Sequence, residues 1–282
     1  MGTTENRPIA FAERALATSF DAKAAQYARL RPGYPQVAVD LAVPARRSLV
    51  LDLGAGTGKL TGSVLDLARG VIAVEPLAGM LTELHRRYPA AVAVAGNAEH
   101  IPLQTNTIDA VVVGQAFHWF DPELALGEIA RVLRPGGTLS LLWNHDDETD
   151  PLFREVQDAL GRAGRPAGGT TRRSVDNRNG RQQDDDVQRA ANGQQPTGSQ
   201  NPPFTGHPRF DEPALTEIAW QRTQSVDELI DLLNTYSYVI RATDETRKQL
   251  AAEVRQIVRR HQAELAQVVI PVVCQVWRST CR

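Results

Sequence analysis

A glycine-rich turn, and an acidic residue one strand later, are the features of this sequence most able to bind a ligand. Residues 52–58 read Asp-Leu-Gly-Ala-Gly-Thr-Gly and follow the apolar run 48–53, and Glu75 lies near the end of a second apolar run at 70–76. Glycine permits positive φ and lets a ligand lie against bare main chain. A carboxylate at the end of the second strand can accept hydrogen bonds from both hydroxyls of a ribose. The pattern therefore predicts a site for a ligand that contains a nucleoside.

The spacing of the glycines distinguishes between two classes of nucleoside cofactor. The dinucleotide fingerprint G-x-G-x-x-G rests a pyrophosphate on a helix N-terminus. Here the glycines are Gly54, Gly56 and Gly58, and Lys59 occupies the position where that fingerprint requires glycine. The acid that opens the turn, this glycine spacing and the ribose acid together favour S-adenosylmethionine, which has no pyrophosphate.

The elements that must position this turn alternate between strand and helix from residue 48 to residue 144. Amphipathic stretches at helical spacing separate short apolar runs, and each run has the length of a buried strand. These runs predict five strands, at 48–53, 70–76, 91–96, 108–114 and 138–143. Such an alternation predicts a doubly wound α/β fold, with a mostly parallel sheet covered by helices on both faces.

The helix before the fifth strand carries clear boundary signals. Asp121 can cap it, and Pro122 takes its first helical position. Arg131 and Arg134 are predicted to lie in its last turn, where basic residues suit the helix dipole. The Pro-Gly-Gly run at 135–137 is then predicted to end it.

Two further strands are predicted near the C-terminus, which brings the sheet to seven. Segment 214–220 has a strand pattern, and Ser225 with Glu228 matches a capping box at the start of a helix. A second amphipathic helix follows, and 268–277 is predicted to be extended. Because Pro271 has no N–H to donate to a ladder, its presence favours an edge position or a bulge.

The segments that flank the alternating region differ from it in composition. Residues 8–43 have helical patterns interrupted by the RPGYP run at 31–35. Residues 162–203 contain no Leu, Ile, Met or aromatic residue, so they cannot bury enough apolar surface to offset the entropy of ordering. We expect a disordered insertion there. Its arginines are mixed with aspartates, which favours a solvated linker over a contact with RNA.

Composition excludes several classes of protein. The chain has 282 residues and a formal net charge of −2, which argues against a protein built mainly to hold nucleic acid. Cys274 and Cys281 are its two cysteines, too few for a disulfide framework and typical of a reducing compartment. No apolar run has the length of a signal peptide at the N-terminus, and none approaches the ~20 residues that span a bilayer. We expect a soluble, cytoplasmic protein that binds neither membrane nor nucleic acid.

Five segments of the chain resemble, in order, the motifs of class I S-adenosylmethionine-dependent methyltransferases of the type 11 family. They are LDLGAGTGKLT, VEPLAGML, GNAEHIPL, DAVVVGQAFHWF and EIARVLRPGGTLSLLWN. The resemblance is closer to the small-molecule branch that includes trans-aconitate methyltransferase, because FDAKAAQYARLRPGYP resembles the opening segment of that branch. It covers about 20–160, with further similarity at 225–239, and 162–203 departs from it. It implies a Rossmann-like fold with a helical N-terminal lid, and S-adenosyl-L-methionine as the methyl donor.

The resemblance also implies a role for each residue of a cofactor site. Asp52 would hold the ammonium group of the methionine part, and Glu75 would take the ribose hydroxyls. Tyr27 and Arg31 belong to the lid, where a guanidinium could pair with the methionine carboxylate. The other implied contacts come from the glycine turn and from the segments after the second, third and fourth strands: Gly54, Ala55, Gly56, Gly58, Pro76, Met80, Asn97, Ala98, Glu99, Gln115, Ala116 and Phe117.

Several of these residues also have a plain structural interpretation. Met80 could be an ordinary core residue, and Asn97 could cap a turn. Tyr34, also in the opening segment, could only pack the lid, and Arg31 could pair with a surface acid. These alternatives stay open at the level of the sequence.

His118 is the one residue we would name as catalytic. Methyl transfer from a sulfonium depends mainly on positioning and on the exclusion of water, and a base is needed only where the acceptor must lose a proton. An imidazole could accept that proton at neutral pH. A hydrogen-bonded structural histidine is the alternative. Tyr236 and Tyr238 could help to line the acceptor pocket, or could pack between lobes.

The sequence therefore predicts a methyltransferase with a small-molecule methyl acceptor, by O-, C- or carboxyl-methylation, and with no metal site. The alternatives are a non-catalytic binding or regulatory protein that keeps the cofactor site, and an NAD(P)-dependent oxidoreductase. The expected organisation assigns four segments: a helical lid at 1–47, a cofactor-binding core at 48–161, the insertion at 162–209, and a part at 210–282 that completes the sheet and the acceptor pocket.

Overall fold

A computed structural model of the chain describes most of the alternating region and the C-terminal part. The described residues are 32–43, 48–147, 149–164, 202, 204–240, 242–262 and 267–282. Tyr27, Arg31 and most of the predicted insertion lie outside them, as does the side chain of Tyr238.

Seven strands form one sheet in the order β3-β2-β1-β4-β5-β7-β6. Their bounds are β1 (Leu49–Leu53), β2 (Gly70–Glu75), β3 (Val92–Ala95), β4 (Ile108–Gly114), β5 (Leu133–Asp146), β6 (Ala214–Gln224) and β7 (Val268–Thr280). Strands β1 to β5 are parallel to one another, and β7 runs antiparallel to both β5 and β6. The predicted doubly wound, mostly parallel sheet is confirmed. Strand order reverses between β1 and β4, which is where ligands bind in such sheets.

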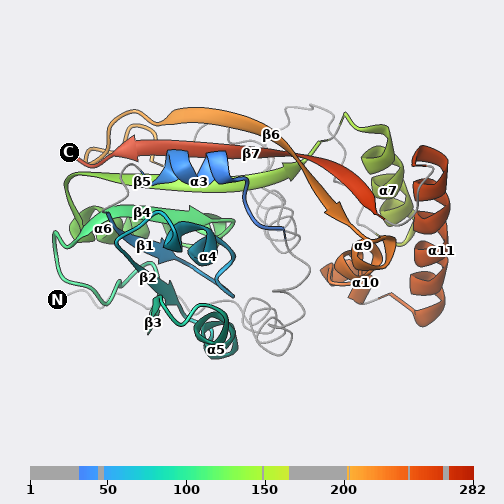
Figure 1. Ribbon diagram of the computed structural model, residues 1–282, viewed down its shortest axis with the longest axis horizontal. Helices are drawn as coiled ribbons and strands as arrows, with labels where there is room; N and C mark the ends of the chain where they lie inside the picture. Colours follow the sequence, from blue (N-terminus) through green and yellow to red (C-terminus); the bar gives the residue numbers. More distant parts are fainter. Residues whose placement is uncertain are drawn as a thin grey trace, which may run out of the picture.

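The helices cover both faces of the sheet and one end of it (Figure 1). Their bounds are α3 (Gln36–Ala42), α4 (Lys59–Leu65), α5 (Ala78–Arg87), η1 (Phe117–Trp119), α6 (Pro122–Val132), α7 (Pro151–Arg162), α9 (Val226–Leu233), α10 (Ser237–Ile240) and α11 (Asp244–His261). Helices α3 and α4 pack on one face of the sheet, and α6 packs on the other.

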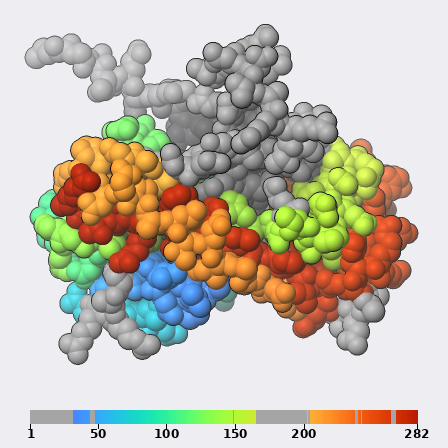
Figure 2. Space-filling model, turned by 90° about the horizontal axis from the view of Figure 1, so that it is seen from above, coloured from blue at the N-terminus to red at the C-terminus, as the bar shows by residue number. Residues whose placement is uncertain are grey.

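A second apolar core lies at the end of the sheet toward which β4 and β5 point (Figure 1). It joins one face of α7, α9 and α11 to the first residues of β7, including Val268, Ile270 and Val272. We call this part the helical lobe. Figure 2 shows the lobe at one end of the long axis, with β6 and β7 in orange and red reaching toward it. The lobe therefore stands beyond the carboxyl ends of the parallel strands, on the side of the sheet where a ligand binds.

The end of α6 corrects one detail of the sequence analysis. Asp121 caps this helix by accepting from the Leu124 N–H, with Pro122 at the first turn, as predicted. The helix ends at Val132, however, so the prediction that Arg134 lies in its last turn is wrong. Leu133 already pairs with Ile108 of β4, and a register shift follows before Thr138 resumes the ladder. Within the Pro-Gly-Gly run, the Gly136 N–H donates to the Cys281 carbonyl and the Gly137 carbonyl accepts from the Cys281 N–H, so pairing on the β7 side carries the strand through it.

The position of Pro271 corrects a second detail. Strand β7 lies between β5 and β6 and is not an edge strand. Pairing with β5 starts only at Val272, which faces the last residue of that strand, Asp146. The Pro271 carbonyl accepts from the Asp147 N–H, and the N and C=O of one strand residue point to the same side. The missing N–H therefore faces Asp147 just past the end of β5, so only the reciprocal bond at the very end of the β5–β7 ladder is lost.

Close packing between α4 and the end of α5 yields a stability prediction. A Cβ at Gly62 would lie 2.4 Å from the Tyr88 ring. Alanine normally stabilises a helix interior by about 1 kcal/mol relative to glycine. Here we expect Gly62→Ala to destabilise the protein by about 1–3 kcal/mol, because the ring must move. Chemical denaturation measures this difference.

Gly127 provides the matched control for that prediction. It lies in α6, is exposed, and has no atom within 4 Å of an added Cβ. Gly127→Ala should therefore stabilise the protein by about 0.5–1 kcal/mol. Equal effects of the two substitutions would contradict the packing described for Tyr88.

Candidate active site

The glycine-rich turn after β1 adopts the conformation that its composition predicts. Gly54, Gly56 and Gly58 have φ of 70°, 56° and 85°, all in the left-handed region. The N–H groups of Gly54 and Ala55 donate to the Val74 carbonyl at 2.9 and 3.1 Å. The turn is therefore tied to β2, and α4 begins directly after it without a side-chain cap.

Glu75 connects the turn to the end of β2. The residue is 6% exposed. Its Oε2 accepts from the Gly56 N–H at 2.9 Å, and its Oε1 accepts from the Leu77 N–H at 3.0 Å. A carboxylate has about four acceptor sites. It can therefore be held in place by these two backbone donors and still accept from the hydroxyls of a ligand.

Asp52 is buried beside the turn. It is 1% exposed, and its Oδ2 accepts from the Thr61 hydroxyl at 2.5 Å. Burial raises the pKa of Asp52 to about 7; the Thr61 hydrogen bonds lower it, and the nearby charge of Glu75 raises it further. A cationic neighbour would lower this raised pKa, because it stabilises the ionised form of the carboxyl group.

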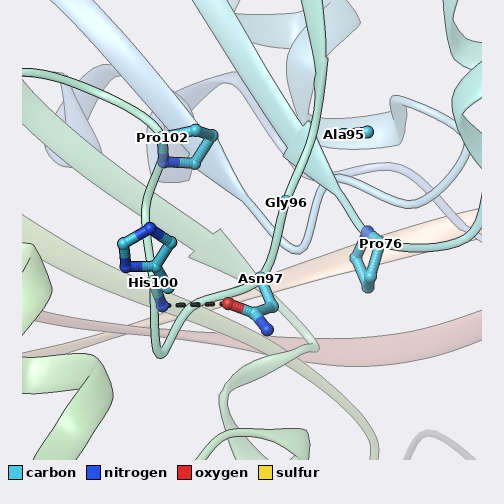
Figure 3. A pocket seen from close by; sticks show the side chains of 6 residues that line it. All are labelled: Pro76, Ala95, Gly96, Asn97, His100 and Pro102. Atoms are coloured by element: carbon cyan, nitrogen blue, oxygen red, sulfur yellow. Dashed lines mark hydrogen bonds between the residues drawn. The ribbon is translucent and has the colours of Figure 1, made fainter.

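A pocket of about 320 Å³ opens beside the ends of β2 and β3. Six residues line it: Pro76, Ala95, Gly96, Asn97, His100 and Pro102. Figure 3 shows Asn97 and His100 on the same loop, with the Asn97 Oδ1 accepting from the His100 N–H at 2.9 Å, and with Pro76 on the opposite side. The pocket combines apolar proline walls with amide and imidazole groups, which suits a flat heterocycle.

Three other predicted cofactor contacts do not belong to this lining. Met80 and Ala98 are 4% and 2% exposed, and Ala98 packs in the main core. The Glu99 Oε1 accepts from the Asp121 N–H at 2.9 Å, which ties the loop after β3 to the start of α6. The structural interpretation is therefore sufficient to explain these three side chains.

The segment after β4 lies directly against the glycine turn. A Cβ at Gly54 would lie only 2.8 Å from the Ala116 Cβ and 3.1 Å from the Phe120 ring. Gln115 has φ of 56°, uncommon for a residue other than glycine, and its Nε2 donates to the Asn144 carbonyl at 2.9 Å. Phe117 is 4% exposed. Strained backbone of this kind clusters at functional sites.

Aromatic rings surround His118. Its ring centroid lies 4.9 Å from that of Trp119 and 5.4 Å from that of Trp143. Trp119, the last residue of η1, is 44% exposed. Tyr236, by contrast, is buried in the helical lobe, so packing accounts for it.

The opening segment reaches this site through residues 33 and 34. The Asn144 Nδ2 donates to the Gly33 carbonyl at 2.9 Å. The Tyr34 hydroxyl lies 2.4 Å from the position of a Cβ at Gly114, so glycine is required there. Tyr34 thus packs on the end of β4. Tyr27 and Arg31 lie outside the described residues.

The chain is similar to known methyltransferases over most of its length. A family model described as a methyltransferase domain matches residues 51–141. A protein of Mycobacterium tuberculosis named as an uncharacterized methyltransferase is 38% identical over 250 residues, which cover 89% of each chain. A protein of Schizosaccharomyces pombe named as methyltransferase-like is 30% identical over 246 residues, or 86% of each chain. The chain belongs to the methyltransferase family.

A solved structure shows the same fold. It comes from Anaeromyxobacter dehalogenans, is described as a type II methyltransferase, and has a TM-score of 0.57 at 20% identity, covering 89% of this chain and 97% of that one. The methyltransferase is a class I enzyme with S-adenosylmethionine as its methyl donor, and it acts on a methyl acceptor. No helix in the described ranges combines the length and apolar character needed to cross a membrane.

Some residues of the methyltransferase site are not apparent from the sequence alone. Thr61, which donates to Asp52, has the pattern of an ordinary helix residue, although it closes the first motif. Ala95, Gly96, His100 and Pro102 line the pocket and are not among the site residues that the sequence predicts. All of them lie in or next to GNAEHIPL, and it is the fold that brings Pro102 back against Gly96, where an added Cβ would meet it at 2.8 Å.

Proposed function

We propose that this methyltransferase transfers the methyl group to a small-molecule acceptor, by O-, C- or carboxyl-methylation. Its near-neutral charge supports this over a nucleic-acid acceptor, since phosphate backbones are held mainly by Lys and Arg. The acceptor would bind between the carboxyl ends of β4 and β5 and the helical lobe. The trans-aconitate branch, which the opening segment resembles, also methylates a small molecule.

One observation carries the placement of the cofactor: Glu75 is buried at the end of β2, and its carboxylate is held by the Gly56 and Leu77 N–H groups. We assign it the two ribose hydroxyls. Asp52 would take the ammonium group, since a cation offsets the desolvation of its buried carboxyl. The backbone of Gly54 and Ala55 would lie against the methionine part.

The other assignments follow the same geometry. The pocket lined by Pro76 and Asn97 would take the adenine ring. Gln115, Ala116 and Phe117 would pass beside the methionine chain, because this segment touches the glycine turn. Further assigned contacts are Gly56, Gly58, Met80, Ala98 and Glu99, and, from the lid, Tyr27 and Arg31.

The chain's own residues have three tasks in the reaction. The bound cofactor supplies a methyl group on a cationic sulfonium, which is an excellent leaving group. Glu75 would fix the ribose and Asp52 the ammonium group, and the segment after β4 would direct the reactive centre toward the acceptor. Rigid placement of this kind can provide much of the acceleration. His118 would accept a proton on a ring nitrogen where the acceptor carries one.

This role of His118 predicts a defined kinetic result. For an acceptor that must lose a proton, we expect His118→Ala to lower kcat/KM by about 10²–10⁴-fold, the usual range for loss of a general base. Steady-state kinetics measure it, with the affinity for S-adenosylhomocysteine as control. A kcat/KM within a few-fold of the parent would assign His118 a structural role only.

An acceptor screen tests the proposed function. Candidate small molecules are incubated with the enzyme and S-adenosylmethionine, and the methylated product is detected by mass spectrometry. Cofactor binding with no release of S-adenosylhomocysteine on any acceptor would favour the regulatory alternative. Tighter binding of NAD(H) than of S-adenosylmethionine would favour an oxidoreductase.

The state of the cysteines supports a reducing, cytoplasmic setting. Cys274 and Cys281 are both free and buried. Burial raises the pKa of the Cys274 thiol to about 12, so little thiolate is available to react.

The division of the chain into a lid, a core, an insertion and a C-terminal part remains a proposal.

A further inference from the structure

A group of polar side chains is buried on the sheet beside the helical lobe, apart from the cofactor contacts. Asp146, the last residue of β5, pairs with Val272 of β7. Val272 pairs on its other side with Trp220 of β6. Alternate residues of β6 point to this face of the sheet, toward α3 and the lobe core. Three of them form what we call the β6 cluster: Trp220, Arg222 and Gln224.

The guanidinium of Arg222 is the centre of this cluster. The side chain is only 10% exposed. Its Nη1 donates to the Gln224 Oε1 at 3.1 Å, and its Nη2 reaches the Asp146 Oδ1 at 3.3 Å, a long contact for an ion pair. These two bonds fix the plane of the guanidinium, and its Nε is left for another partner.

Each member of the β6 cluster holds a buried donor without an acceptor. They are the Trp220 Nε1, the Arg222 Nε and the Gln224 Nε2, and none of them reaches an oxygen among the described residues. Buried polar atoms in folded proteins nearly always have a partner, and an unsatisfied one signals a missing group. Trp and Arg side chains are donors only, so the missing group must be an acceptor.

We propose that the β6 cluster binds a carboxylate of the methyl acceptor. A carboxylate offers about four acceptor sites on two oxygens in one plane, which matches a fixed guanidinium flanked by two further N–H donors. Asp146 neutralises Arg222 only partly at its long distance, so the guanidinium keeps attraction for a second anion. This inference rests on the proposed position of the acceptor next to the helical lobe.

The register of β5 places this carboxylate away from the reaction centre. Gly114, the end of β4, pairs with Leu142, and Asp146 lies four residues further along β5. At about 3.3 Å per residue, Asp146 and the Arg222 guanidinium beside it stand roughly 13 Å along the strand beyond the edge where the cofactor is proposed to bind. The carboxylate would therefore serve as a handle that orients the acceptor, and a different atom would receive the methyl group.

Ligand binding to the enzyme saturated with S-adenosylhomocysteine tests the proposal. The probes are short-chain and aromatic carboxylates, each paired with its uncharged primary amide, in saturation-transfer NMR and calorimetry. We expect the parent to bind at least one carboxylate about 10-fold or more tightly than its amide. Arg222→Met should remove that preference. Asp146→Asn should strengthen carboxylate binding several-fold, because it frees the guanidinium.

Controls separate this site from folding and from the cofactor site. Arg255→Met removes an exposed arginine paired with Asp227 and should leave the carboxylate preference intact. The affinity for S-adenosylhomocysteine should stay within two-fold in all three variants, so its loss in the parent would refute the proposed function instead. Equal binding of carboxylates and amides by the parent, which would mean that the cluster holds only water, overturns the inference. Weaker carboxylate binding in Asp146→Asn would also overturn it.

Discussion

Glu75→Gln is expected to weaken S-adenosylmethionine binding by at least about 100-fold. The buried carboxylate would lose two charge-assisted hydrogen bonds to the ribose, each worth about 1.5–3 kcal/mol. It would also lose one of the two acceptors that hold Gly56 and Leu77, since an amide has one oxygen where the carboxylate has two. Both effects weaken binding, because the second loosens the turn that lies against the cofactor. Isothermal titration calorimetry measures the change.

The matched control for this substitution is Glu83→Gln. Glu83 lies nearby in α5, and its carboxylate pairs with Arg86 outside the proposed site. Glu83→Gln removes the same charge from the same region but touches no assigned cofactor contact, so cofactor affinity should stay within about two-fold. If Glu75→Gln also leaves the affinity unchanged, the assignment of the ribose to β2 is wrong.

Asp52→Asn should stabilise the free protein and at the same time abolish tight cofactor binding. Burial raises the pKa of Asp52 from 3.8 to about 7. Ionising it inside the fold above pH 7 therefore costs about 4 kcal/mol relative to the unfolded chain. Asparagine can still accept from the Thr61 hydroxyl but carries no charge. Without the charge, the ammonium group loses its partner.

The stability difference between Asp52→Asn and the parent should depend on pH, and the raised pKa sets its direction. Between pH 3.8 and about 7, the folded protein keeps a proton on Asp52 that the unfolded chain has released. The contribution of this group to stability therefore falls as pH rises. The Tm of Asp52→Asn should match the parent near pH 4 and exceed it by several degrees at pH 8. A lower Tm at pH 8 would show that the carboxylate stabilises the fold.

The sheet could be predicted from the sequence because the strands at its centre are buried on both faces. Such strands read as continuous apolar runs, and the run at 108–114 has the same bounds as β4. The start of β5 could not be predicted, since a Pro-Gly-Gly run signals a turn and only long-range pairing, with β4 at Leu133 and with Cys281 at Gly136 and Gly137, extends the strand through it. The prediction of an edge position for Pro271 is wrong because a central strand tolerates proline where its neighbour ends, and β5 ends opposite Val272.

Some residues of the site can be predicted from local sequence, and others only from contacts between distant parts of the chain. The turn at 52–58 and Glu75 are local signals, because residue type and spacing within one short stretch of chain are enough to identify them. His100 and Pro102 needed the fold, since the pocket they line exists only where two loops meet. The β6 cluster is the extreme case. Trp220 and Arg222 lie in an ordinary alternating strand, and only their register against β7 and β5 brings them to Asp146.

The unusual length of β5 and β7 has a consequence for how the molecule melts. Both strands run without interruption from the main sheet to the edge of the helical lobe, so the two apolar cores share backbone hydrogen bonds. Unfolding of one core would break backbone hydrogen bonds of β5 and β7 that also stabilise the other core. We therefore expect the enzyme to unfold in a single cooperative transition despite its elongated shape.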